Sequence, residues 1–363
     1  MAAHVDDPVL TPLHQLDGVR EHASPRDRLR AVRRAAHELR ERLLSGARVT
    51  YYETFDLAIV PYPLRYGLRD ACPLPAPFVH ILNRLFIVQF ETADGALKTL
   101  LAEPLDRLGS AETPYFKRLA APFGGSRALV PRLLWPPLGD VVGLLERVGI
   151  PRDEVDYITF DHLHTQDVRG WLIGKDGEPP VFPSAKLLVF REEWDDARAP
   201  IPPQRDWYPP RGYDGVGEDK LILLDRSVLL GDSVALVHTP GHTRGNHSIV
   251  AHTDDGLLVT SENGISADSY APSRSRIPGL RRYAREREAE VVLNGNTLEG
   301  STEQYLSMVL EKELAGPCPQ NPDFYNVSPS SELAGHLLSP GLRPTFSFGQ
   351  RRYGAPRTRS AVE

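Results

Sequence analysis

Two histidines, His162 and His164, directly follow a short apolar run at 155–160 that is typical of a buried strand. Alternate residues that leave the end of a strand can point to the same side, so both imidazoles can face one metal ion. A third histidine, His242, lies within Thr-Pro-Gly-His-Thr, again directly after an apolar run. Since three imidazoles suit zinc, the pattern predicts a metal site built at strand ends.

A carboxylate follows a further predicted strand. Glu262 comes directly after the apolar run at 257–260, and three imidazoles with one carboxylate leave room on a metal ion for water. Two more histidines, His238 and His247, flank His242; we expect one to belong to a strand and the other to pack behind the site. The alternative without a metal treats the three ligands as hydrogen-bonded polar residues of a fold that has lost its ion.

Three segments carry this chemistry in a fixed order: HLHTQD at 162–167, TPGHT at 239–243 and Ser-Glu at 261–262. In this order they resemble the motifs of the metallo-β-lactamase superfamily, and the resemblance covers about residues 80–314. It implies an α/β fold, the four-layer αββα sandwich of that family, here with an N-terminal helical extension. It also implies a metal-dependent hydrolase.

The chain departs from the family's usual His-x-His-x-Asp-His pattern in the second metal site. Gln166 stands in the place of the aspartate, Asp167 in the place of the second-metal histidine, and Glu262 in the place of the bridging aspartate; Asn296 replaces a late histidine. The first site keeps its three imidazoles, whereas the second keeps only oxygen donors, which favour hard ions such as Mn, Mg or Ca. We therefore expect one zinc ion, with iron or manganese and a mixed pair of ions as alternatives.

The resemblance also suggests roles for the remaining residues. We expect Glu262 to ligate the metal or to accept a hydrogen bond from water, and Asp167 to ligate it or to carry a proton to the leaving group. An alternative for Asp167 is a salt bridge to Arg169 or a hydrogen bond that orients an imidazole. Gln166 and Asn296 are expected to contact the substrate; a turn-forming role is the alternative for Asn296.

The expected reaction is hydrolysis of an ester, lactone or thioester by metal-activated water. A phosphodiester is less suitable, because a single ion cannot clamp both the attacking and the leaving oxygen. Two other functions stay open. A mononuclear iron oxygenase of the same fold fits a site with fewer metals, although three histidines lean toward zinc. A non-catalytic member that only binds a ligand is the third interpretation.

Periodicity predicts the elements that position these residues. Apolar residues at spacings of three and four predict a helix between Ser24 and Gly46, docked on the domain or on a second subunit. Strands at 85–91 and 96–102 are predicted to form a hairpin around Ala-Asp-Gly. Further predicted elements are helices at 138–149 and 304–314 and strands at 221–224, 227–230, 234–238, 248–252 and 290–293.

Composition bounds the class of protein. The 363 residues carry 42 basic and 48 acidic side chains, a net charge of −6, which argues against nucleic acid or an anionic membrane as partner. Only Cys72 and Cys318 are present, so a disulfide scaffold is excluded. No apolar run has the length of an export signal or a membrane span. We expect a cytoplasmic protein with a small-molecule substrate, and a homodimer as one candidate assembly.

These patterns suggest three regions. Residues 1–79 are expected to be an N-terminal extension with an amphipathic helix, and residues 80–315 the metallo-β-lactamase-like domain. Residues 316–363 are rich in Pro, Gly and Ser. Since segments of that composition usually lack structure of their own, we expect a loose tail that carries no chemistry.

Overall fold

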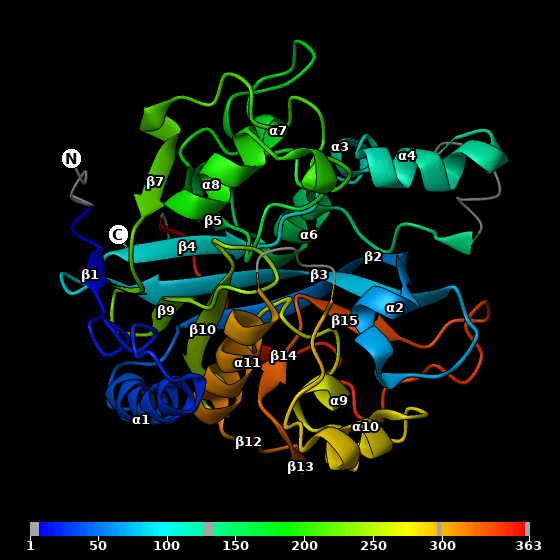
Figure 1. The fold of residues 1–363 in the computed structure, drawn as a ribbon. Coiled ribbons are helices and arrows are strands. Elements are labelled where there is room, and N and C mark those ends of the chain that lie inside the picture. The colour runs from blue at the N-terminus through cyan, green and yellow to red at the C-terminus, as the bar shows by residue number, and fades with distance from the viewer. Residues whose placement is uncertain (1–6, 126–133, 296–299, 360–363) are drawn as a thin grey trace.

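The computed structural model describes residues 7–125, 134–295 and 300–359. Two β-sheets lie face to face, and helices cover the outer face of each (Figure 1). The larger sheet has eight strands in the order β16-β2-β3-β4-β5-β6-β7, with β15 beside β3. Its strands are β2 (Tyr51–Pro63), β3 (Phe78–Glu91), β4 (Leu97–Ala102), β5 (Tyr157–Thr159), β6 (Lys186–Phe190), β7 (Leu221–Leu224), β15 (Ser331–Ala334) and β16 (Arg352–Gly354).

The second sheet has six strands in the order β1-β8-β9-β10-β11-β14. They are β1 (Leu10–Pro12), β8 (Val228–Leu230), β9 (Val234–His238), β10 (His247–Thr253), β11 (Gly256–Thr260) and β14 (Val327–Ser328). A separate pair is formed by β12 (Pro317–Cys318) and β13 (Asn321–Tyr325). The helices are α1 (Pro25–Leu44), α2 (Leu64–Gly67), α3 (Arg107–Ala111), α4 (Pro114–Ala120), α6 (Val141–Val148), α7 (Arg169–Leu172), α8 (Arg191–Arg198), α9 (Ala267–Tyr270), α10 (Leu280–Arg287) and α11 (Ser301–Ala315).

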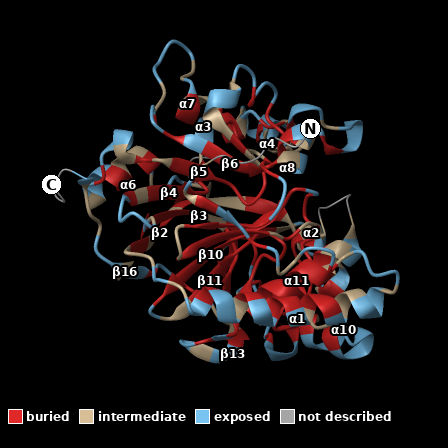
Figure 2. Cartoon of the chain, turned by 90° about the vertical axis from the view of Figure 1, so that its left-hand side faces the viewer, coloured by how far each residue is buried: buried red, intermediate tan, exposed pale blue. Residues whose placement is uncertain are grey.

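The side-chain alternation of the strands produces the layers. In β3, Phe86 and Val88 point inward and pack in one cluster with Leu236 of the facing sheet, whereas Leu85 and Ile87 point outward and pack with α6, α7 and α8. The outer face of the six-stranded sheet packs in the same way against α1 and α11. Both sheets are buried in consequence (Figure 2). The predicted αββα sandwich is therefore confirmed.

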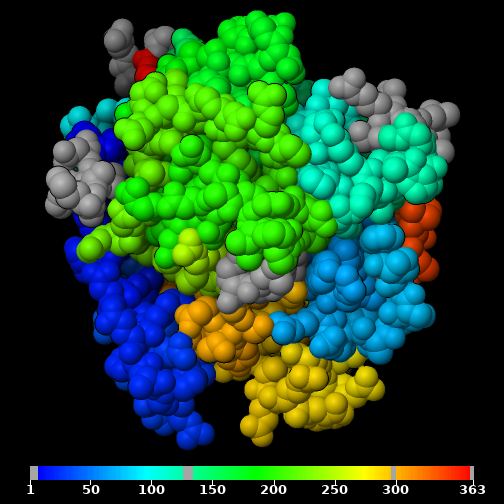
Figure 3. All heavy atoms as spheres, turned by 45° about the horizontal axis from the view of Figure 1, so that its top comes forward, coloured from blue at the N-terminus to red at the C-terminus, as the bar shows by residue number. Residues whose placement is uncertain are grey.

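The N-terminal helix is also confirmed and lies on its own domain. The apolar stripe of α1 is buried against α11 and the six-stranded sheet, and Figure 3 shows α1, dark blue, beside α11, orange. The β3–β4 hairpin pairs antiparallel as predicted. The domain boundaries and the oligomeric state stay predictions. No helix of the described residues is both long enough and apolar enough to span a membrane.

Two expectations for local structure are wrong. Residues 290–293 form no strand, because their backbone bonds to no neighbouring strand among the described residues: the Val292 amide donates to the Ser269 carbonyl in α9, and the Asn294 amide that follows donates to the Asn263 carbonyl. The tail beyond residue 315 is not loose either. It supplies β14 to the small sheet and β15 and β16 to the large one. The predicted N-terminal extension likewise contains β2, which pairs with β3 from Phe78 to Gln89.

Candidate metal centre

The first two histidines leave the carboxyl end of β5 in the large sheet. Parallel strands place their carboxyl ends at one edge, where loops with functional side chains gather. Thr165, directly after His164, has a φ of 63°, so the chain turns sharply there. His242 comes from the loop between β9 and β10 in the other sheet. A Cβ on Gly241 would lie 2.3 Å from the Cα of Gln304 in α11, so only glycine allows this loop to pack so closely.

The three imidazoles converge. One ligand atom from each of His162, His164 and His242 lies within 4.8 Å of the others, and all three residues are buried. Their ring centroids are 4.6 to 5.2 Å apart. Among the described residues, both ring nitrogens of His164 and Nδ1 of His242 have no hydrogen-bond partner. Burial lowers the pKa of these two residues well below the ordinary value. Neutral, buried, unpartnered nitrogens fit a cation, which would satisfy them.

Asp161 orients the first imidazole. Its Oδ1 lies 2.6 Å from Nδ1 of His162, which leaves Nε2 free for a metal. Burial lowers the pKa of His162, but the charge of Asp161 outweighs it, and the net shift is upward. Asp161 is held in turn: Ser330 donates to its Oδ2 at 2.7 Å, and its amide donates to Glu103 at 2.6 Å.

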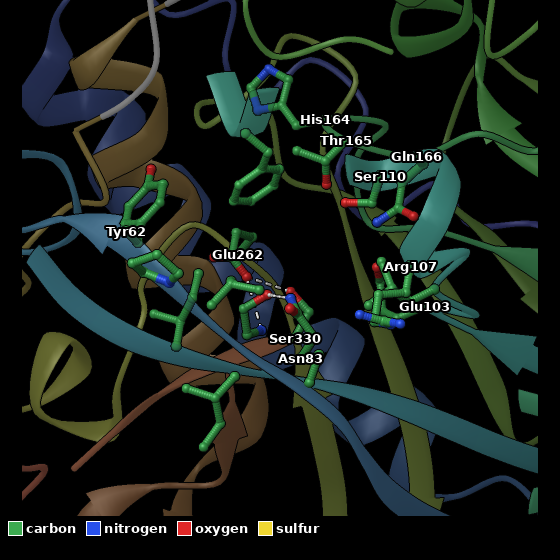
Figure 4. A pocket seen from close by; sticks show the side chains of 18 of the residues that line it. Tyr62, Asn83, Glu103, Arg107, Ser110, His164, Thr165, Gln166, Glu262 and Ser330 are labelled. Atoms are coloured by element: carbon green, nitrogen blue, oxygen red, sulfur yellow. Dashed lines mark hydrogen bonds between the residues drawn. The ribbon is translucent and has the colours of Figure 1, made fainter. Parts of the chain in front are cut away.

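Glu262 lies beside the imidazoles in the wall of a cavity, although the metal-competent cluster found among the described residues contains only the three histidines. Its Oε2 lies 2.7 Å from Ser330 Oγ and accepts a hydrogen bond from the Ser331 amide at 2.9 Å (Figure 4). Burial, reinforced by the negative charge of Asp161, raises the pKa of Glu262 to about 8. These contacts fix the carboxyl group in the cavity wall, and its role as a metal ligand or as an acceptor for water stays a prediction.

The structure does not bring Asp167 to the imidazoles. Its carboxylate accepts hydrogen bonds from Arg169 Nη2 at 2.7 Å and Lys175 Nζ at 2.8 Å. This arrangement matches the alternative in which Asp167 forms a salt bridge with Arg169. Burial opposes ionisation, but these two partners outweigh it and lower the pKa of Asp167. Gln166 does line the cavity. Asn296 lies outside the described residues.

No family model matches the chain. A segment of 133 residues, 36% of the chain, is 28% identical to an N-acyl homoserine lactonase from Bacillus sp., of which it spans 47%. With the three motifs in order, their imidazoles converged and the αββα layers in place, the chain has the architecture of the metallo-β-lactamase fold.

Solved structures with similarity to this metallo-β-lactamase-fold chain include three hydrolases. One is a quorum-quenching N-acyl homoserine lactone lactonase, 15% identical, TM-score 0.44, covering 68% of this chain and 90% of that one. A second is a probable metal-dependent hydrolase from Staphylococcus aureus, 13% identical, TM-score 0.48, covering 72% and 83%. The third is the dizinc quorum-quenching lactonase AidC, 13% identical, TM-score 0.46, covering 86% and 97%.

The metallo-β-lactamase-fold site opens into a cavity of about 170 Å³. Its lining includes the apolar side chains of Leu105, Phe116 and Trp135. Four polar side chains are labelled on the side opposite Tyr62 in Figure 4: Glu103, Arg107, Ser110 and Gln166. Hydrophobic walls with a few placed polar groups are typical of small-molecule sites.

A buried network supports the loop of His242 from behind. Asn263 Oδ1 accepts from the His242 amide at 3.0 Å, and Asn263 Nδ2 donates to Glu311 Oε1 at 2.7 Å. Glu311 also accepts from Ser248 and Tyr270 at 3.0 and 2.8 Å. Burial raises the pKa of Glu311 to about 7 even though its hydrogen bonds oppose the shift.

Sequence reasoning gave no role to several residues of this site. Asp161 was visible next to His162, but its orienting role needs the observed contact. Glu103 follows the predicted strand at 96–102, where its φ of 59° is unusual for a non-glycine residue and turns the chain at the strand end. Ser330 gave no signal at all, because it reaches the site from the segment expected to be a loose tail.

Proposed function

We propose that this chain is a metal-dependent hydrolase that cleaves a small ester, lactone or thioester, with one zinc ion held by His162, His164 and His242. The observation that carries the proposal is the group of three buried imidazoles, with unpartnered nitrogens, in the lining of a largely apolar cavity. A divalent cation at such a group supplies a Lewis acid and lowers the pKa of water, which together favour attack on a carbonyl.

Other residues of the site orient the metal ligands, accept the proton of water or contact the substrate. Asp161 keeps His162 in the tautomer that presents Nε2. Glu262, held by Ser330 and Ser331, is placed to accept a hydrogen bond or a proton from the attacking water. Gln166 contacts the substrate, and we keep the same expectation for Asn296. We assign Asp167 a structural role, since Arg169 and Lys175 already bind both of its oxygens.

A single ion is favoured over a pair. At the positions where the family places second-metal ligands, Gln166 offers a neutral amide and Asp167 is bound to two cations. Neither supplies an imidazole, and a second zinc ion prefers nitrogen or sulfur donors.

The substrate is expected to be a small molecule with an apolar group next to its carbonyl, because Phe116, Trp135 and Leu105 form much of the cavity wall. The name of the Bacillus relative, an N-acyl homoserine lactonase, supports a lactone among the three carbonyl classes. A cytoplasmic location and a homodimer remain predictions alongside this one.

The test combines metal analysis with hydrolysis. Purified protein should contain one zinc ion per chain and hydrolyse aryl esters or γ-lactones, and His242→Ala should lose both properties. His22→Ala, at an exposed histidine far from the motifs in sequence, is the matched control and should lose neither. Stoichiometric iron with negligible zinc would replace the proposal by the oxygenase alternative. Full function in the cell with His162→Ala would favour a non-catalytic role.

A further inference from the structure

One cation of the cavity has no counter-charge among the residues that the structure describes. Arg107 lines the cavity and is exposed. Among the described residues, no carboxylate pairs with its guanidinium. The other arginine of the cavity wall, Arg84, is buried and bound to Asp56 at 2.9 Å and Glu332 at 2.5 Å. Arg84 is therefore committed to the fold, whereas Arg107 is available to a ligand.

The backbone that carries Arg107 is held firmly. Arg107 is the first residue of α3, and Asp106 caps that helix by accepting from the amides of Leu108 at 3.0 Å and Gly109 at 2.9 Å. The second oxygen of Asp106 lies 3.3 Å from Lys175 Nζ. The nearest acidic neighbour in sequence is thus engaged by the helix amides and by Lys175, and it leaves the guanidinium free.

Lys175 links this cap to Asp167, which it contacts at 2.8 Å. A Cβ on Gly109 would lie 2.6 Å from the Cβ of Asp167, so α3 packs directly on the loop that follows the two histidines. The position of Arg107 is in this way tied to the metal-binding loop. Through these contacts, Asp167 holds α3 in place relative to the imidazoles.

The lining of the cavity combines two kinds of chemistry. It contains apolar side chains, with Phe116 and Trp135 among them, and the guanidinium of Arg107. A ligand that satisfies both has an apolar body and an anionic group. The planar guanidinium matches the two oxygens of a carboxylate, with which it can form paired, charge-assisted hydrogen bonds.

Resting on the proposed hydrolase function, we propose that Arg107 determines specificity by binding a carboxylate on the substrate, remote from the carbonyl that is cleaved. The preferred substrate class is then an apolar ester or lactone that carries one free carboxylate. Hydrolysis breaks the acyl C–O bond, with the hydroxyl from water joining the acyl carbon and the proton going to the leaving alkoxide; the remote carboxylate is unchanged.

Two esters of equal chain length test this proposal: p-nitrophenyl hexanoate and the mono-p-nitrophenyl ester of adipic acid, which adds a terminal carboxylate. The measured quantity is the ratio of kcat/KM for the adipate ester to that for the hexanoate. In the wild type the adipate ester should be preferred. Arg107→Met should lower the ratio about tenfold to a hundredfold, the range for hydrogen bonds to charged groups. Arg107→Lys should restore part of it.

Arg152→Met is the control, since Arg152 is an exposed arginine outside the cavity wall, and it should leave the ratio unchanged. An unchanged ratio in Arg107→Met, or no preference in the wild type, would overturn the assignment. A separate readout covers the case in which neither ester is cleaved and the hydrolase proposal fails. Calorimetric titration of zinc-loaded protein with adipate and with hexanoate should give a Kd ratio that Arg107→Met shifts by the same factor; equal ratios would refute the role of Arg107.

Discussion

Glu311 offers a quantitative test of the network that supports His242. This carboxylate is fully buried in α11 and accepts hydrogen bonds from Ser248, Asn263 and Tyr270. Burial raises its pKa from 4.5 to about 7. A group that binds its proton more tightly in the fold than in the unfolded chain makes the folded protein more stable when protonated. Its contribution is therefore fully present below pH 4.5 and is lost as the pH rises through 7.

The size of this effect follows from the pKa difference. At about 1.4 kcal/mol for each pKa unit, a pKa of about 7 in the fold against 4.5 in the unfolded chain corresponds to about 3 kcal/mol. Glu311→Gln keeps the shape and carries no charge at any pH. Its amide nitrogen can replace Oε2 and donate to Tyr270, whose hydroxyl can also accept. The variant should consequently lack this part of the pH dependence.

The assay is guanidinium unfolding of wild type and Glu311→Gln from pH 4.5 to 8, with a chelator present so that metal binding adds nothing. The free energy of unfolding of the variant, relative to wild type, should rise by about 3 kcal/mol across this range. Glu146→Gln, at an exposed position on α6, controls for the removal of one surface carboxylate. If the free energies of unfolding of wild type and Glu311→Gln changed in parallel with pH, the reasoning would be refuted. Such a result would mean that Glu311 ionises equally easily in the folded and the unfolded chain.

Three further predictions concern the metal site. Asp161→Asn should weaken zinc binding about tenfold to a hundredfold, the usual effect of losing the carboxylate that orients a ligating imidazole; competition with a chromophoric chelator measures it, and unaltered affinity would contradict the orienting role. Gly241→Ala should destabilise the fold by about 1–3 kcal/mol and lower zinc occupancy, since its Cβ would meet the backbone of α11 at 2.3 Å, whereas Gly170→Ala meets nothing within 4 Å and should change neither Tm nor zinc content. Asp167→Asn should cost about 1–3 kcal/mol through weaker bonds to its two basic partners and yet keep full zinc content; loss of zinc would return Asp167 to the ligand set.

The part of the site that sequence reasoning found depends on local spacing. His162 and His164 are close neighbours after one strand, and His242 lies in a glycine-proline loop after another. Each group is defined by the end of a strand with a clear apolar pattern. The fold class is implied by the family resemblance that these same segments carry, whereas the strands themselves are predicted as apolar runs, because both faces of each sheet are buried.

Asp167 shows where spacing alone misleads. The pattern places it two residues after Thr165, but the φ of 63° at Thr165 breaks the alternation that a strand end would give. The carboxylate then turns toward Arg169 and Lys175. A single left-handed residue is not visible in composition or periodicity, and it decides whether the next carboxylate faces the cavity or the protein.

The tail beyond residue 315 shows a second limit, which is physical as well. Composition indicates how well a segment can form a hydrophobic core of its own. The tail is rich in Pro, Ser and Gly and cannot form one. Its strands instead complete sheets that other segments have already built: β15 pairs with β3 and β14 with β11. The energy that orders such a segment comes from the hydrogen-bonding edges and apolar faces of distant strands, so its own sequence carries little of the signal. Ser330 lies between these two strands, and its hydroxyl contacts Glu262 and Asp161 at 2.7 Å each. The segment that sequence reasoning set aside therefore supplies the group that joins the two carboxylates nearest to His162.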